Sequence, residues 1–366
     1  MQITPIQTPL IVAAVGARVG IATDGLPAAG RHAITAAWAD ARLRRRSDAD
    51  VTVRTPTSAD ERQSLSDLSS LVTHAAISAR RGELWMLHAA GLAAPDGGVV
   101  VLVGRSGAGK TTATKVLGRS LGYVSDETIG IEEDGTVHPY RKPLSVITPG
   151  ERFKLQHPPR SLGLLPLPSA KLHVRRIILL DRDPDTIGAR LSNVPLTEAL
   201  VTLSEQSSAL AAMPTPLRTM ASLIRRTGGV LRASYAEAHF LTSLLDDIFT
   251  GETCPADAAD AREATVTAPP VHPAPHATDV RYRRRSDVVD WCTVPDDQIA
   301  VLTSEVDGRG TLRILGPLAS ALWRASDGST RYELMADLPR CFAEPDHAVD
   351  FTLSQLVEAG LLTVDM

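Results

Sequence analysis

Short apolar runs alternate with longer amphipathic stretches in the first two thirds of the chain. Residues 9–22 contain two short apolar runs, which predict two strands. Residues 64–81 carry apolar side chains at helical spacing, which predicts a helix capped by Ser64. Residues 83–93 and 99–103 are compact apolar runs typical of buried strands, and the second run is β-branched.

The alternation of strands and helices continues beyond residue 103. Residues 111–122 predict a helix, residues 123–134 a strand that ends in a turn, and residues 174–180 another buried strand. Alternation of this kind is typical of an α/β unit. Because the extra strand-rich stretches favour a mixed sheet as much as a parallel one, we expect an α/β fold with a mixed sheet.

The composition changes between residues 252 and 279. This stretch is rich in Ala, Pro and Thr and has no apolar periodicity. Such a composition predicts a semi-extended linker. Beyond it, three strand-like segments are followed by three helix-like segments, which is enough for a small α+β domain. We therefore expect an α/β domain over 1–251, a linker over 252–279 and an α+β domain over 280–366.

The overall composition narrows the class of protein. With 43% hydrophobic and 22% charged residues, the chain can build globular cores, while a net charge of −4 and 4% aromatic residues do not favour nucleic acid. The apolar run at 9–22 is broken by Arg18 and is shorter than the roughly 20 residues that span a bilayer. Cys254, Cys292 and Cys341 are too scattered for a disulfide framework or a zinc site. We expect a cytoplasmic protein with reduced thiols that binds neither nucleic acid nor membrane.

A complete phosphate-binding loop follows the strand at 99–103. It matches G-x-x-x-x-G-K-[ST] and stands between a predicted strand and a predicted helix, as the motif requires. Its backbone N–H groups would surround phosphates, its lysine would reach the β- and γ-phosphates, and its threonine hydroxyl would ligate Mg²⁺. We expect ATP and Mg²⁺ as cofactors. The expected nucleotide-binding residues are Gly104, Arg105, Ser106, Gly107, Ala108, Gly109, Lys110, Thr111 and Thr112.

Phosphoryl transfer also needs a carboxylate that faces the metal and a group that orients or deprotonates the acceptor. Asp126, followed by Glu127, lies 16 residues beyond Lys110, so one helix and one turn return the chain to the sheet beside the loop. Asp181, at the end of a strand, is an alternative acid. His88, on the strand before the loop, is a third candidate, since two neighbouring strands could bring it to the phosphate side.

The segments LHAAGLA, VVVLVGRSGAGKTTA and GYVSDETIGI resemble the catalytic domain of HPr kinase/phosphorylase, which shares its fold with phosphoenolpyruvate carboxykinase. The resemblance covers about residues 84–147. It implies that His88 and Asp126 are catalytic and that Asp126 is the base toward an acceptor hydroxyl. In an alternative arrangement Asp126 faces the metal together with Thr111, and Glu127 is the base.

The chain departs from this family at two acidic positions. Glu127 stands where the family has an aspartate, and the further metal-binding glutamate of the family has no clear counterpart. Glu151 falls at a similar distance, but in a different local sequence. Arg141 and Lys142 stand where a cationic clamp could hold the transferring phosphate.

The C-terminal region resembles a PqqD-like domain, a winged-helix-like unit that recognises precursor peptides of ribosomally made natural products. The match lies in DVVDWCTVPDDQIAVL, GPLASALW and FTLSQLVEAGLL. It implies that a leader peptide adds as a strand to the sheet edge at 311–316 and packs against the helix at 347–359. The expected peptide contacts are Leu312, Ile314, Leu353 and Leu356.

The two resemblances together imply an ATP-dependent kinase that phosphorylates a Ser or Thr hydroxyl of a precursor peptide held by the C-terminal domain. Kinases of this type stand beside lasso-peptide assembly enzymes, so other biosynthetic enzymes are expected partners, and HPr-kinase relatives are often homo-oligomers. Two alternatives remain: an ATP-gated peptide chaperone without phosphoryl transfer, and a small-molecule kinase that uses the C-terminal domain for docking.

Overall fold

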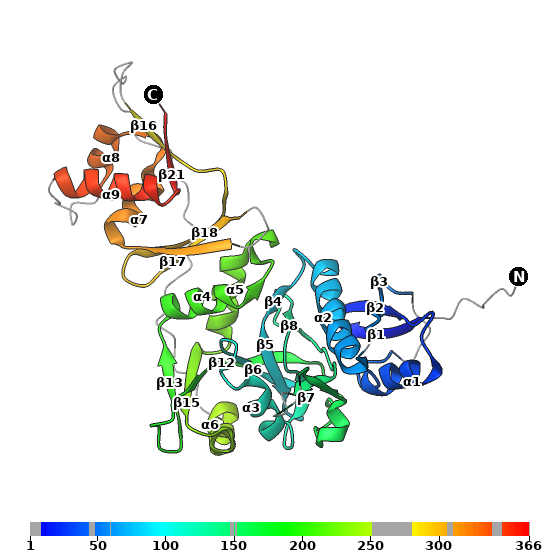
Figure 1. The fold of residues 1–366 in the computed structure, drawn as a ribbon. Coiled ribbons are helices and arrows are strands. Elements are labelled where there is room, and N and C mark those ends of the chain that lie inside the picture. The colour runs from blue at the N-terminus through cyan, green and yellow to red at the C-terminus, as the bar shows by residue number, and fades with distance from the viewer. Residues whose placement is uncertain are drawn as a thin grey trace, which may run out of the picture.

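The structure, a computed structural model, describes residues 9–43, 48–58, 60–146, 150, 152–250, 280–305, 310–338 and 346–365 (Figure 1). The predicted linker at 252–279, Cys254, Cys341 and Glu151 lie outside these ranges. Within them, no helix has both the length and the apolar content that crossing a membrane requires.

A six-stranded mixed sheet forms the centre of the body, by which we mean the described residues up to 250. Its strands are β5 (Ala89–Ala93), β6 (Gly98–Val103), β7 (Gly122–Ser125), β12 (His173–Arg182), β13 (Ala189–Val194) and β15 (Val230–Tyr235). Their order is β13-β15-β12-β6-β5-β7. β6, β12 and β15 are parallel, whereas β5 and β13 are antiparallel to their neighbours. The expected α/β fold with a mixed sheet is confirmed.

The side chains of β6 alternate between two apolar cores. Val99, Val101 and Val103 enter the core on one face of the sheet. Val100 and Leu102 enter the core on the opposite face, because successive side chains of a strand point to opposite sides. The helices that cover the two faces are α4 (Leu196–Glu205) and α5 (Pro216–Arg226) on the first, and α3 (Lys110–Leu117), the 3-10 helix η3 (Ala238–Leu244) and α6 (Leu245–Thr250) on the second.

Smaller sheets complete the body. One, in the order β14-β4-β8-β9, contains β4 (Trp85–Leu87), β8 (Ile129–Ile131), β9 (Val137–His138) and β14 (Ser207–Ser208). Another contains β1 (Leu10–Ala14), β2 (Ala17–Ala22) and β3 (Val51–Arg54), with helices α1 (Ala28–Ala37) and α2 (Glu61–Ala79). The remaining elements of the body are β10 (Leu144–Val146), paired with β11 (Leu155–His157), and the 3-10 helices η1 (Pro159–Leu162) and η2 (Leu210–Ala212).

The predicted helix at 64–81 begins earlier than expected. Asp60, and not Ser64, is the N-cap of α2, since its side chain accepts a hydrogen bond of 2.8 Å from the backbone N–H of Arg62. Ser64 lies in the first turn, where its hydroxyl donates to the carbonyl of Asp60. The two strands expected at 9–22 are β1 and β2.

Two of the expected strands are each divided between two sheets. The run at 83–93 becomes β4 and β5, with His88 at the break between them. The run at 123–134 becomes β7 and β8, with Asp126 and Glu127 at the break. The polar residues His88 and Asp126–Thr128 mark the two breaks in the sequence, but the change of sheet does not follow from them, because all residues of the four short strands are buried.

The two breaks lie side by side. Leu87 pairs with Ile129 in the smaller sheet, and Gly91 pairs with Ser125 in the central sheet. The chain therefore passes between the two sheets twice, and the two crossings are neighbours because the strands on both sides of them pair with each other. His88 is consequently placed opposite the acid pair.

The tail, the described residues from 280 onward, has two three-stranded sheets. One contains β17 (Val288–Val294), β18 (Gln298–Ser304) and β19 (Gly310–Leu315) in that order. The other contains β20 (Asp327–Thr330), β16 (Arg281–Arg284) and β21 (Leu362–Asp365). The helices are α7 (Pro317–Ala325), α8 (Arg331–Asp337) and α9 (Asp346–Glu358). β16, β20 and β21 were not expected, because they pair segments that lie far apart along the chain.

The sheet β17-β18-β19 is covered on both faces. Ile299 and Val301 of β18 enter the core that the tail builds with α7 and α9. Ala300 and Leu302 point to the other side and enter the core of α4 and α5. In Figure 1, β17 and β18 lie next to these two helices. All four residues are fully buried. The tail and the body therefore share one continuous apolar core.

Asp290 on β17 strengthens this contact. Its carboxylate accepts hydrogen bonds from the backbone N–H groups of Leu217 and Arg218, at 3.0 and 3.3 Å, and from the Arg218 guanidinium at 3.3 Å. These amides belong to the first turn of α5, whose own N-cap, Thr215, makes no side-chain capping bond. Because the first-turn amides of a helix have no partners within the helix, the tail supplies the cap that a body helix lacks.

Candidate functional site

The phosphate-binding loop occupies residues 104–109 and leads directly into the first residue of α3, Lys110. Gly107 and Gly109 have φ angles of 86° and 87°, a left-handed conformation that glycine adopts without strain. The helix N-terminus and the loop amides are thus arranged in the way that favours a bound anion.

A cavity of about 380 Å³ opens beside this loop. Its walls come from the loop, the first turns of α3, the two strand breaks and the segments next to β10 and β11. The predicted residues that line it are His88, Arg105, Ser106, Gly107, Gly109, Lys110, Thr111, Thr112, Asp126, Glu127 and Lys142. Thus His88 and both acids share a cavity with the loop, although up to 39 positions separate them along the chain.

Lys110 lines the cavity and is buried. Its ammonium donates hydrogen bonds to the backbone carbonyls of Gly104 and Arg105. Burial lowers the pKa of Lys110 from its ordinary value of 10.5, and the charges of Asp126 and Glu127 oppose that shift. The two carboxylates therefore help to keep a desolvated ammonium charged.

Asp126 is held by groups on three sides. The Tyr123 hydroxyl donates to Oδ1 at 3.0 Å, and the Thr111 hydroxyl donates to Oδ2 at 3.4 Å. The Lys142 ammonium lies 3.6 Å from Oδ1. Burial and the charge of Asp126 raise the pKa of Tyr123 well above 10, so the phenol keeps its proton and remains a donor. The Asp126 carboxylate is thereby fixed beside the loop threonine.

Lys142 makes an ion pair with each of the two acids. Its ammonium lies 2.9 Å from Glu127 Oε2 and also donates to the carbonyl of Pro143 at 3.1 Å. Burial lowers the pKa of Lys142, but the charges of Asp126 and Glu127 outweigh this effect and the pKa is raised. Lys142 is therefore charged, and in this arrangement its charge holds the carboxylates together where the sequence analysis expected a phosphate clamp.

Replacing Lys142 with methionine should lower the free energy of unfolding by about 3–5 kcal/mol, because removing one partner of a buried pair leaves uncompensated charge. Lys171→Met is the matched control, since Lys171 and Asp134 form an exposed pair at 3.6 Å. That control should cost about 0–1 kcal/mol. Urea unfolding followed by circular dichroism measures both. Equal midpoints for the two variants would contradict the role of Lys142.

Arg141, the other predicted clamp residue, points elsewhere. Its guanidinium donates to the carbonyl of Tyr123 at 3.2 Å and lies 3.5 Å from Asp40 Oδ1. It is absent from the described residues that line the cavity. Its contacts show a residue that joins β7 to the segment after α1, so the structure offers no support for Arg141 as a phosphate clamp.

His88 lines the cavity opposite the acids. Its backbone N–H donates to the carbonyl of Gln206 at 2.7 Å, which fixes the break between β4 and β5. Burial lowers the pKa of His88 below its ordinary value of 6.5, Lys110 lowers it further, and Glu127 partly opposes the shift. The imidazole is therefore mostly neutral at pH 7 and offers one donor and one acceptor nitrogen.

Asp181, the alternative acid, does not share this environment. It accepts a hydrogen bond of 3.1 Å from the Ser234 hydroxyl and lies 4.0 Å from the Arg232 guanidinium. It is not among the described residues that line the cavity. The strand beside it supports the loop in another way, since the Tyr235 hydroxyl donates to the carbonyl of Ala108 at 3.0 Å.

Several residues of this site were not predicted from the sequence. Lys115, Ser145 and Lys154 line the cavity, and Tyr123 fixes Asp126 from behind. Lys115 stands one helical turn beyond Thr111, so helix periodicity could have indicated it. Ser145, Lys154 and Tyr123 carry no local signal, because they reach the site through pairings that depend on the fold.

The donor set of the cavity fits Mg²⁺. The Thr111 hydroxyl, in the first turn of α3, and Asp126 Oδ2 are oxygen atoms 3.4 Å apart. Mg²⁺ prefers oxygen ligands, and in nucleotide sites it is commonly held by one or two carboxylates together with substrate phosphates. Thr111 and Asp126 are therefore the residues that would hold the ion.

The predicted peptide contacts of the tail fall into two groups. Leu353 and Leu356 on α9 are 1% and 3% exposed and belong to the core of the tail, so they offer no surface to a peptide in this arrangement. Leu312 and Ile314 on β19 are half-buried and pack against the core shared with the body. The apolar positions of α9 belong to the same core as Ile299 and Val301 of the tail sheet.

Comparisons with known proteins add little to this geometry. No family model matches the chain, and no curated protein matches it in sequence. A solved structure, the HPr(Ser) kinase/phosphatase from Coxiella burnetii, is similar over 44% of this chain and 92% of its own, with 15% identity and a TM-score of 0.24. A likeness this weak assigns no activity, so the site itself must support any function.

Proposed function

We propose that this protein is an ATP-dependent kinase that transfers the γ-phosphoryl group to a hydroxyl. The observation that carries the proposal is the contact of Asp126 Oδ2 with the Thr111 hydroxyl, in a cavity that also contains Lys110. A phosphate-binding loop alone would support nucleotide binding. An acid fixed beside the loop threonine adds the second element that phosphoryl transfer requires.

In the proposed reaction, the loop amides and Lys110 hold the β- and γ-phosphates, and the N-terminus of α3 favours their charge. Thr111 and Asp126 are the residues that would hold Mg²⁺, and the ion would supply positive charge against the phosphates. The acceptor oxygen forms a bond to the γ-phosphorus while the bond to the bridging oxygen breaks, and ADP leaves. His88, as a neutral imidazole opposite the acids, orients the acceptor.

Glu127 is the better candidate for the base in this proposal. Both acids line the cavity, but the Asp126 side chain is 3% exposed and both of its oxygens have partners, whereas the Glu127 side chain is 33% exposed. A proton leaving the acceptor hydroxyl can reach a carboxylate only if one of its oxygens is accessible. We therefore assign Asp126 to the metal and Glu127 to the proton, which is the second of the two arrangements that the sequence left open.

Matched substitutions distinguish the two acids. Asp126→Asn should raise the Mg²⁺ concentration needed for half-maximal transfer, because it removes a charged ligand. Glu127→Gln should lower kcat by about 10²- to 10⁴-fold with an unchanged Mg²⁺ requirement. Initial rates measured across a Mg²⁺ titration test both expectations. The opposite pattern, with the Mg²⁺ requirement shifted by Glu127→Gln alone, would return the base to Asp126.

We further propose that the acceptor is a Ser or Thr hydroxyl of a peptide that the tail helps to bind. The resemblance of the tail to PqqD-like domains supports this proposal, as does its close packing against the catalytic body. A tethered recognition unit raises the effective concentration of a weakly bound substrate, so the catalytic cavity needs few specific contacts of its own.

The test is to incubate the protein with γ-labelled ATP, Mg²⁺ and either a pool of Ser- and Thr-containing peptides or a set of small hydroxylated metabolites. Label on a peptide supports the proposal. Label only on a small molecule would indicate a small-molecule kinase. ATP binding without any transfer would indicate a nucleotide-gated chaperone and would refute the proposed kinase.

A further inference from the structure

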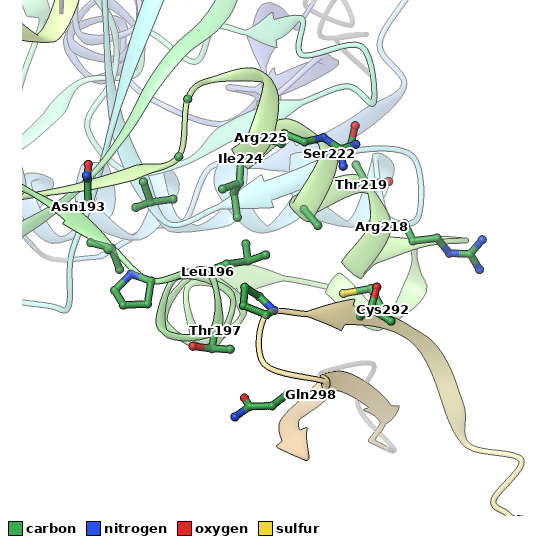
Figure 2. Close-up of a pocket in the computed structure, with 18 of the residues that line it drawn as sticks. Asn193, Leu196, Thr197, Arg218, Thr219, Ser222, Ile224, Arg225, Cys292 and Gln298 are labelled. Atoms are coloured by element: carbon green, nitrogen blue, oxygen red, sulfur yellow. The ribbon is translucent and has the colours of Figure 1, made fainter. Parts of the chain in front are cut away.

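A second cavity lies where the tail meets the body. It has a volume of about 730 Å³, within the range of ligand pockets, and is larger than the cavity at the phosphate-binding loop. Residues at the start of α4 and along α5 line it from the body, and residues of β17 and the turn to β18 line it from the tail (Figure 2). Any ligand in this cavity would therefore touch both parts of the protein.

The lining indicates a neutral ligand with many hydrogen-bonding groups. Thr197, Ser222 and Thr293 contribute hydroxyls, and Asn193 and Gln298 contribute amides. None of the described lining residues is aromatic or a lysine, and the charged ones, Arg218 and Arg225 with Glu133 and Asp296, are two of each sign and add no net charge. Nucleobases and sugar rings are usually held by stacking on aromatic side chains, and phosphates by an excess of cations, which this lining does not have, so neither fits well. A peptide backbone, with alternating N–H donors and C=O acceptors, fits better.

The shape of the cavity also favours an extended chain. The cavity runs along α5, because its lining begins at the N-cap, Thr215, and continues through Thr219 and Ser222 to Arg225 in the last turn. From Thr215 to Arg225 a helix rises by about 15 Å. An extended peptide covers that length with about five residues.

Two strand edges open into the same cavity. β13 is the outermost strand of the central sheet, and its last residues, Asn193 and Val194, line the cavity. β17 is the outermost strand of its sheet on the tail, and Cys292 and Thr293 near its end line the cavity; Figure 2 shows Cys292 beside α5. Outermost strands expose backbone N–H and C=O groups, which bind an added strand.

We propose that this cavity is the docking site for an extended, uncharged segment of the peptide substrate, between α5 and the edge of β17. The proposal rests on the proposed kinase function and differs from the groove between β19 and α9 that the sequence analysis expected. It places recognition on the surface that the tail and the body form together.

The site also sets the spacing between recognition and phosphorylation. α4 begins in the docking cavity at Leu196 and ends at Glu205, whose carboxylate lies 3.7 Å from the Arg105 guanidinium of the phosphate-binding loop. Ten helical residues span about 15 Å. A substrate that follows α4 needs about five extended residues for that distance, so the modified hydroxyl should lie at least that far from the docked segment.

The test starts from a randomised twelve-residue peptide library that is panned on the full-length protein without nucleotide. Affinities of enriched peptides are then measured by fluorescence anisotropy for the wild-type protein and for two variants that fill the cavity, Ser222→Trp from the body and Thr293→Trp from the tail. Ser243→Trp, an exposed position on η3, is the control. Thermal melting checks that all four proteins are folded.

We expect both cavity variants to weaken binding by about tenfold or more, with no change for the control. Equal affinities in all four proteins, or no enriched peptide, would overturn the docking site. The kinase proposal is judged separately with labelled ATP. A docked peptide that receives no label refutes the kinase and keeps the site, whereas equal labelling by wild type and Ser222→Trp refutes the site and keeps the kinase.

Discussion

Replacing Lys110 with alanine should reduce phosphoryl transfer by about 10²- to 10³-fold or more, because it removes the preorganised cation from the β- and γ-phosphates. The measurement is the initial rate of label transfer from γ-labelled ATP at saturating Mg²⁺. Nucleotide affinity, measured by calorimetry, should fall as well, since the same ammonium contacts the ground-state phosphates.

Lys115→Ala is the matched control for this prediction. Lys115 lines the same cavity from the next turn of α3, so its removal changes the local charge by the same amount. It stands outside the loop motif, and we expect a change of less than about tenfold. Equal losses for both variants would show that overall positive charge matters and that Lys110 has no special position.

Replacing Asp290 with alanine should loosen the contact between the tail and the body. The change leaves the first-turn amides of Leu217 and Arg218 without their acceptor, and a buried unsatisfied donor costs about 1–3 kcal/mol. We expect a lower melting temperature and faster hydrogen exchange at these two amides. Because α5 also lines the docking cavity, peptide affinity should fall even though no lining residue is changed.

Asp287→Ala is the control for Asp290. Asp287 pairs with Arg285 on the surface at 3.1 Å and lies in the same part of the tail. A surface pair of this kind contributes about 0–1 kcal/mol, so its loss should leave the exchange of the α5 amides unchanged. Unchanged exchange in the Asp290→Ala variant would show that the tail does not cap α5 in solution.

The parts of the fold and site that lie within one short segment could be predicted from the sequence. The strand at 99–103, the glycine loop and the helix that follows are contiguous, so their arrangement is contained in one short segment. The mixed α/β class followed from the alternation of apolar patterns. The proximity of Asp126 to the loop followed from the short return through α3 to β7.

Contacts between distant segments could not be predicted in the same way. Nothing near Lys142 indicates that its ammonium lies between two carboxylates, because this depends on how the segment before β10 crosses β7. Asp290 and Leu217 are 73 positions apart, and no local pattern links them. The apolar side of α9 was visible in the sequence, but its partner, the tail core, was not.

The breaks that hold His88 and the acids also limit how this protein can change in length. Side chains alternate along β8, so one residue inserted or deleted after Ser125 would exchange the two faces of that strand. An isoleucine would then occupy the position of Gly130, where a Cβ would lie only 2.7 Å from Val15 Cγ1. We therefore expect relatives of this chain to gain and lose residues in their surface loops, while the number of residues between the positions of Ser125 and Ile129 stays constant.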